Sequence, residues 1–160
     1  MLLAFFLAQV TPMQPMPRGT GLPPAADSAG DTQAVLATVR RFLAALEAND
    51  GPAILATTSA EGGATATMTG PDGAAVVRHM NWADFAKRFT PGGDRFSEAI
   101  SDPAVEIDGG IAMVWAPYTV RRNGAFQHCG YDHLDLVREG GAWKLLNITW
   151  SQRTTGCDAR

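Results

Sequence analysis

Runs of apolar and β-branched residues, separated by turn signals, fill the C-terminal third of this chain. The runs lie at 110–120, 126–138 and 143–150, and the pairs Asn123-Gly124 and Gly140-Gly141 separate them. A two-residue turn of type I′ needs positive φ angles at both central positions, which Asn and Gly adopt at low cost. The pattern therefore predicts a three-strand antiparallel meander of long strands.

Helical periodicity marks three segments upstream of the meander. Asp31 can cap a helix that reaches about Ala48, where Asn49-Asp50-Gly51 ends it. A proline suits the first position of a short second helix at 52–58. Asn81 can cap a third helix. The apolar faces of the first and third helices consist of Val35, Leu36, Val39, Phe42, Leu43 and Leu46, and of Trp82, Phe85 and Phe89.

Shorter strand patterns lie between the helices and before the meander. Thr65–Thr69 and Ala75–His79 flank a Gly-Pro-Asp-Gly loop, which predicts a hairpin. A further strand at 96–107 is interrupted at Asp102-Pro103. The predicted order is α-α-β-β-α-β-β-β-β, so the helices must cover one face of a curved antiparallel sheet in an α+β architecture. The chain shows no internal repeat and no second core, which predicts one domain at 31–156.

The first 30 residues have a different character. Met1–Val10 is an apolar stretch that is too short to span a bilayer as a helix, and it resembles the hydrophobic region of a secretory signal. Residues 11–30 are rich in Pro, Gly, Ala and Met and are not expected to fold. The two segments predict a periplasmic or secreted protein with no stable membrane span. A misplaced start or a disordered end is the other interpretation, because no Lys or Arg precedes the apolar stretch.

Composition narrows the classes of partner and cofactor. The chain has 160 residues, of which 46% are hydrophobic and 18% are charged, and its net charge is −3. Nucleic acid is excluded as the main partner because phosphate binding needs a basic face. The histidines lack metal-ligand spacing and no Gly-rich phosphate loop opens a helix, so we expect no metal and no other cofactor. Cys129 and Cys157 can form one disulfide in an oxidising compartment if Gly156 turns the tail back over the sheet.

Two stretches carry a resemblance to a known superfamily. They are Val39-Arg-Arg-Phe-Leu-Ala-Ala-Leu-Glu-Ala-Asn-Asp50 and Leu134-Asp-Leu-Val-Arg-Glu-Gly-Gly-Ala-Trp-Lys-Leu145. With the order of elements, they resemble the nuclear transport factor 2-like superfamily, which includes ketosteroid isomerases, scytalone dehydratase and SnoaL-like cyclases. The resemblance, over about 31–154, implies a cystatin-like cone in which a curved sheet and helices enclose a mostly apolar pocket. It also implies that a sheet face can pair with a second subunit, so we expect a homodimer.

The resemblance to the isomerases assigns one catalytic position. Aligned by the Leu-Val-Arg end of its strand, Asp135 falls where those enzymes place a protonated aspartic acid that donates a hydrogen bond to a developing enolate. The position of their tyrosine falls at Phe42, which has no hydroxyl, and that of their general base falls near Ala66. Steroid isomerisation by that mechanism is therefore not expected.

Strand alternation places a histidine beside this aspartate. His133 and Asp135 lie two residues apart and share a sheet face. A carboxylate can orient an imidazole and raise its basicity, so the pair is the candidate for proton transfer. Asp132, with His128, forms the alternative pair on the opposite face, where Arg153 is expected across from His128. A solvated rim for the first pair and a surface ion pair for the second are the plainer interpretations.

The assignment of faces depends on the strand register. With two-residue turns at both ends of the middle strand, Tyr118, Cys129 and Gln152 lie across from one another. A bulge at Pro117 or Gly130 would exchange part of the two faces.

Aromatic side chains supply the candidate ligand contacts because their rings can stack on a flat apolar molecule. The candidates are Trp115, Tyr118, Tyr131, Trp150, Phe42 and Trp82. Two functions follow: an exported domain that binds a small apolar ligand or serves as a dimeric accessory module, and an enzyme that transfers protons as an isomerase, cyclase or lyase. The enzyme hypothesis built on His133 and Asp135 requires both side chains to face an enclosed pocket.

Overall fold

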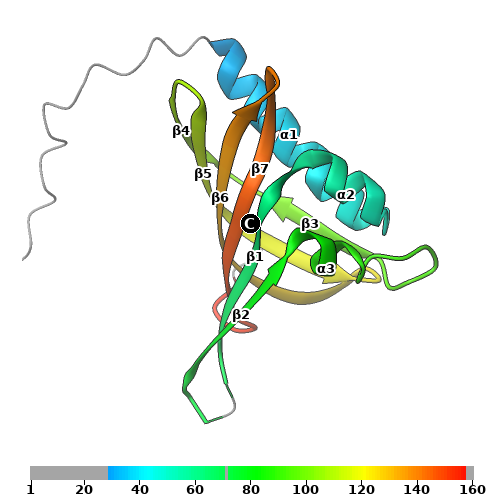
Figure 1. The fold of residues 1–160 in the computed structure, drawn as a ribbon. Coiled ribbons are helices and arrows are strands. Elements are labelled where there is room, and N and C mark those ends of the chain that lie inside the picture. Colours follow the sequence, from blue (N-terminus) through cyan, green and yellow to red (C-terminus); the bar gives the residue numbers. More distant parts are fainter. Residues whose placement is uncertain (1–28, 71, 158–160) are drawn as a thin grey trace, which may run out of the picture.

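Three helices and seven strands make up the part of the chain that the structure, a computed structural model, describes: residues 29–70 and 72–157 (Figure 1). In chain order the elements are α1 (Ala29–Glu47), α2 (Gly51–Thr57), β1 (Thr58–Thr69), β2 (Ala75–Asn81), α3 (Trp82–Ala86), β3 (Phe96–Ile100), β4 (Ala104–Asp108), β5 (Ile111–Arg122), β6 (Ala125–Glu139) and β7 (Ala142–Gln152). The predicted signal-like segment and nearly all of the predicted linker lie outside the described residues. Within those ranges, every helix is too short or too polar to cross a membrane.

The strands form one curved sheet in the order β2-β1-β7-β6-β5-β3, and β4 pairs with β5 beyond the end of β3. β1 and β7 run parallel, whereas all other neighbouring strands are antiparallel. The predicted meander is confirmed as β5, β6 and β7. The strand predicted at 96–107 is divided into β3 and β4 at the expected interruption, where Asp102 has a φ angle of 42°. β1 begins at Thr58 instead of Thr65, and it is longer than its pattern predicts.

The helices lie on one side of the sheet, which we call the inner face, and leave the opposite, outer face uncovered (Figure 1). The apolar stripe predicted for α1 is buried against this face, with Val35 and Phe42 fully inaccessible to solvent. The Trp82 ring packs edge-on against Phe42 and Phe85, at 5.7 and 5.8 Å between ring centroids. Its indole N–H donates to the Leu146 carbonyl at 2.9 Å, so α3 is fixed to β7.

Capping residues begin the two short helices. The Asp50 carboxylate accepts from the Ala53 amide at the start of α2. The Asn81 side chain accepts from the Asp84 amide at the start of α3, as its position predicts. α3 ends at Ala86, earlier than the aromatic spacing indicates. Both caps place their helices over the inner face.

Two β-bulges change the register that the turns alone predict. Val120 pairs with His128 whereas Arg121 pairs with Phe126, so Gln127 is an extra residue on β6. Tyr118 therefore lies across from Gly130 and not from Cys129. The predicted faces of β6 are thus wrong, because the bulge lies nearer the turn than the two positions considered. The extra residue moves every following side chain of β6 to the opposite face.

The second bulge lies on β7. Asp135 pairs with Asn147 and Leu136 pairs with Leu145, which leaves Leu146 as the extra residue. Because of the two bulges, both Leu136 of β6 and Leu145 of β7 point into the core, where each is almost fully buried.

Candidate functional site

A cavity of about 300 Å³ lies between the helices and the inner face of the sheet. Most of its lining is apolar, and the described residues that form it come from α1, α3 and its flanks, and from six of the strands. The apolar lining residues are Phe42, Leu46, Ala66, Met68, Met80, Phe85, Phe89, Phe96, Val120, Ile148 and Trp150. The polar lining residues are Arg78, Arg88, Glu98, Tyr118, His128, Asp132 and Gln152. Arg78 and Arg88 are the exposed members of this lining, so they mark the mouth of the cavity.

Two carboxyl groups, which we call the acid pair, meet in this lining. Glu98 projects from β3 and Asp132 from β6, on either side of β5. Asp132 is only 2% exposed. Glu98 Oε1 and Asp132 Oδ2 are both buried, and neither has a hydrogen-bond partner among the described residues. Leaving a buried acceptor without a partner costs about 1–3 kcal/mol, and one proton shared between the two carboxyl groups reduces that cost.

The acid pair holds a proton more tightly than ordinary carboxyl groups do. Burial raises the pKa of Glu98. Burial, the charge of Glu98 and the hydrogen bond to Glu98 all raise the pKa of Asp132, which lies well above its ordinary value. The same hydrogen bond lowers the pKa of Glu98, in opposition to burial. Asp132 is therefore the protonated member and donates to the Glu98 carboxylate, a pattern expected when two carboxyl groups share one buried site.

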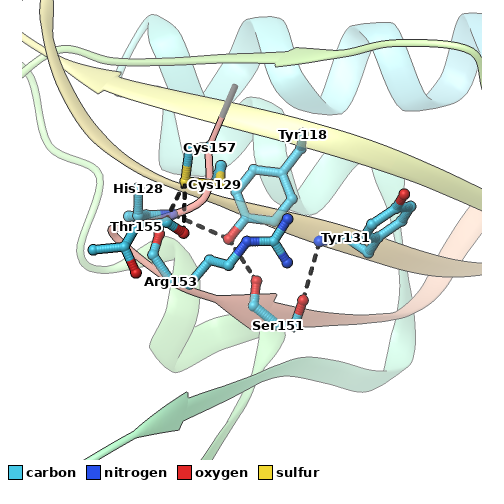
Figure 2. Close-up of a disulfide and its surroundings, with 8 residues drawn as sticks. All are labelled: Tyr118, His128, Cys129, Tyr131, Ser151, Arg153, Thr155 and Cys157. Carbon is cyan, nitrogen blue, oxygen red and sulfur yellow. Dashed lines mark hydrogen bonds between the residues drawn. A yellow bond between two sulfur atoms is a disulfide. The ribbon is translucent and has the colours of Figure 1, made fainter. Parts of the chain in front are cut away.

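A tyrosine–histidine pair belongs to the same cavity lining as the acid pair. Figure 2 shows the two side chains, Tyr118 and His128. The Tyr118 hydroxyl donates to the Ser151 carbonyl at 2.9 Å and lies 3.0 Å from His128 Nδ1. A hydroxyl has one proton to donate, so His128 Nδ1–H is the donor to Tyr118 and Nε2 is left as an acceptor. Burial lowers the pKa of His128, which favours the neutral imidazole.

Tyr118 itself stays a phenol. Burial raises its pKa, and the charges of Asp132 and Glu98 raise it further. The hydroxyl therefore acts as a fixed link between β5, His128 and the Ser151 carbonyl rather than as an acid.

A disulfide holds the C-terminal tail beside this pair. Cys129 and Cys157 are bonded, with their Cα atoms 5.9 Å apart (Figure 2). Cys129 also exchanges two backbone hydrogen bonds with Arg153, each 2.9 Å long. The tail thus returns over β6 next to His128. A second hollow, lined in part by Tyr131 and Arg153, adjoins the disulfide.

The predicted catalytic pair lies outside the cavity. His133 Nε2 and Asp135 Oδ1 are 3.4 Å apart, but their side chains are 34% and 40% exposed and lie on the outer face. The enzyme hypothesis built on this pair requires both side chains to face an enclosed pocket. That condition is not met, because the bulge at Gln127 turns both to the outer face. The same bulge brings the alternative, Asp132, into the cavity together with His128.

The predicted aromatic contacts divide between three environments. Phe42, Tyr118 and Trp150 line the cavity. Trp82 is buried in the core and is absent from the cavity lining. Trp115 and Tyr131 stack on each other at 5.3 Å between centroids and lie on the outer face, outside the cavity lining. The bulge explains the place of Tyr131, whereas Trp115 lies on the face opposite to Tyr118, as alternation along β5 predicts.

The sequence patterns did not predict three of the residues that line the cavity: Glu98, Arg78 and Arg88. Glu98 had a signal: it is the one charged residue on an alternate face that also carries Phe96 and Ile100. No sequence signal marks the two arginines, because isolated basic residues on a short strand or after a helix are common at protein surfaces. No group of three potential ligand side chains among the described residues is close enough to hold a metal ion.

Comparisons with known proteins address the fold. The sequence matches no family model and no curated protein. A protein of unknown function with a cystatin-like fold from Nostoc punctiforme superposes with a TM-score of 0.62 at 14% identity, over 80% of this chain and 95% of that one. An NTF2-like protein from Cytophaga hutchinsonii gives 0.61 at 13% identity, over 79% and 100%.

A third solved structure agrees with these two. The NTF2-like protein of unknown function from Pseudomonas putida superposes with a TM-score of 0.61 at 15% identity, over 81% of this chain and 91% of that one. Identities this low establish a shared fold and leave function open. Three N-terminal helices packed against a curved, unclosed and mostly antiparallel sheet give this chain the cystatin-like or nuclear transport factor 2-like (NTF2-like) fold of these structures.

Proposed function

We propose that this protein binds a small, largely apolar molecule in the cavity, with a polar group of that molecule against the acid pair. The observation that carries the proposal is the buried acid pair in a mostly apolar cavity, where no Lys or Arg of the described residues forms an ion pair with it. A bound molecule that donates hydrogen bonds to the acid pair would stabilise the negative charge that the pair keeps in this buried site.

The rest of the lining supports a small and flat ligand. A volume of about 300 Å³ is at the lower end of the range for ligand pockets. The rings of Phe42, Phe85 and Trp150 offer stacking surfaces, and the flexible thioethers of Met68 and Met80 can adapt to an irregular outline.

Filling the cavity tests the binding proposal. Ala66 is buried and lines the cavity from β1, so Ala66→Trp would place an indole where the ligand lies. We expect native mass spectrometry to show a co-purified small molecule on the wild type and none on the variant. Val77→Trp is the matched control, because Val77 is 66% exposed on the adjacent strand β2 and outside the lining. A folded Ala66→Trp protein that retains the adduct would contradict the proposal.

A second candidate function is proton transfer on the bound molecule. The observation that favours it is the presence of a protonated carboxyl, Asp132, and a neutral imidazole, His128, in one lining. An acid that stays protonated and a base that stays neutral are the two groups that such chemistry requires. His128 and Asp132 could therefore perform the proton transfer that the sequence patterns assigned to His133 and Asp135.

Hydrogen exchange tests this second candidate without a known substrate. We expect the protein to speed deuterium uptake at the α-carbons of small cyclic ketones in heavy water, followed by NMR. His128→Gln and Asp132→Asn should each reduce the enhancement by about 10²-fold or more. His133→Gln, on the outer face, is the control and should leave the rate unchanged. Equal losses in the His128 and His133 variants would exclude the role of His128.

The outer face supports the proposal of a homodimer. Trp115 is 46% exposed and stacks on Tyr131, and Ile111 is exposed on the same strand. Exposed apolar side chains gathered on one face are typical of an interaction surface. We expect sedimentation to show a dimer for the wild type and a monomer for Trp115→Glu. Leu55→Glu, at an exposed position of α2, should stay dimeric. A monomeric wild type at high concentration would exclude this assembly.

A further inference from the structure

We propose that the ligand of this cavity carries a primary ammonium group, which binds to the acid pair and to His128. The inference rests on the proposed binding function and names the chemical class of ligand. Its geometric basis is that Glu98, Asp132 and His128 belong to one lining and that the described residues place no Lys or Arg in an ion pair with the acid pair.

The polar part of the lining is rich in acceptors. Asp132 donates a hydrogen bond to Glu98, so the acid pair shares one proton and keeps one negative charge, and both groups retain acceptor capacity. His128 uses Nδ1–H toward Tyr118, and its Nε2 accepts. An ammonium group has three N–H donors and one positive charge, which match three acceptors and one negative charge. A ligand hydroxyl would satisfy only one acceptor, and a ligand carboxylate would add a like charge to the acid pair.

The apolar walls also suit a cation with a hydrocarbon body. Aromatic rings line the cavity from several sides, and a cation is attracted to an aromatic face, most strongly where water is excluded. Two positively charged side chains, Arg78 and Arg88, also line the cavity and would repel a cationic ligand. They are exposed at its mouth, so salt screens them more strongly than it screens the buried acid pair. The far end of the ligand is therefore neutral or anionic.

Binding of an ammonium group has a second consequence, which is proton release. The positive charge stabilises two carboxylates where the free protein keeps one carboxylate and one carboxylic acid. The O–H bond of Asp132 breaks, the electron pair stays on its carboxylate, and the proton leaves to solvent. Calorimetry in two buffers of different ionisation enthalpy measures this release directly.

Three matched probes test the inference at pH 7 by isothermal titration calorimetry: 2-phenylethylamine, 2-phenylethanol and phenylacetate. We expect the amine to bind at least tenfold more tightly than the alcohol, phenylacetate to bind most weakly, and only the amine to release protons. Glu98→Gln should reduce amine affinity at least tenfold and leave the alcohol unchanged. Glu106→Gln, at an exposed position of β4, is the control and should change neither.

The outcomes separate the inference from the proposed function. Tighter binding of the alcohol or of phenylacetate, or amine binding that Glu98→Gln does not weaken in a folded protein, would overturn the ammonium inference and leave the cavity as a ligand site. Failure of all three probes would also overturn it, whereas the native mass spectrum of the wild type and Ala66→Trp decides separately on the binding function.

Discussion

Replacing Cys129 and Cys157 with serine is expected to lower the free energy of unfolding by about 3–4 kcal/mol. The two cysteines are 28 residues apart, and the bond between them encloses most of β6 and all of β7. Reduction lets the unfolded chain explore conformations that the closed loop forbids, which stabilises the unfolded state. The folded state also loses the tether that holds the tail beside His128. Urea titration monitored by circular dichroism measures the change.

A reduced wild type provides the control for this double variant. It should unfold at the same denaturant concentration as the serine protein, because both lack the closed loop. A loss below about 1 kcal/mol in both would show that the bridge does not constrain the unfolded chain as expected. The same bridge supports the proposal of export, because disulfides persist in oxidising compartments and are rare in a reducing cytosol. An intact mass with two free thiols, for protein taken from its native cells without reductant, would argue against export.

Asp132→Asn is expected to stabilise the folded protein at pH 8 by an amount on the order of 1–3 kcal/mol. The amide keeps a donor for the Glu98 carboxylate, and it removes the second buried group that must otherwise ionise. The pH dependence follows from the raised pKa values of Asp132 and Glu98 in the folded state. A group whose folded pKa is raised binds more protons in the native state than in the unfolded state. Its stability contribution is therefore complete below the unfolded pKa and is lost as the pH rises through the folded pKa.

The wild type should consequently lose stability as the pH rises from about 4 toward 8, and Asp132→Asn should lose less. Chemical denaturation at several pH values measures both slopes. Asp135→Asn is the matched control, because Asp135 lies three positions along β6 at the exposed outer face and should change stability by no more than about 0.5 kcal/mol. Parallel curves for the wild type and Asp132→Asn would contradict the buried acid pair.

The fold follows from patterns that act over short distances. Three features depend only on neighbouring residues, and each is found where those residues predict it. They are the apolar stripe of α1, the Asn81 cap and the turn at Asn123-Gly124. The superposed structures then show that these elements form a cystatin-like or NTF2-like fold. Periodicity and turn chemistry predicted most of these elements because most of them bury one apolar face in a common core.

The site needed one quantity that local patterns do not contain, the strand register. The single extra residue at Gln127 decides whether Asp132 or Asp135 faces the cavity. Nothing in the composition of a strand marks which of its residues is extra, because a bulge is set by the fit of two strands to the curvature of the whole sheet. Glu98 was not predicted for a related reason. It lies near Asp132 because β3 and β6 both pair with β5, and the spacing of residues along the chain does not predict that pairing.

The central claim is that Glu98 and Asp132 form a proton-sharing pair in an apolar ligand cavity. Carbon-13 NMR of the side-chain carboxyl carbons, assigned with Glu98→Gln and Asp132→Asn and followed from pH 3 to 9, tests it most directly. The structure predicts a midpoint for Asp132 well above that of an ordinary aspartate, a coupled response at Glu98, and a shift of both resonances when a ligand enters the cavity. Independent titration of both groups near about 4, as exposed carboxyl groups titrate, would contradict it.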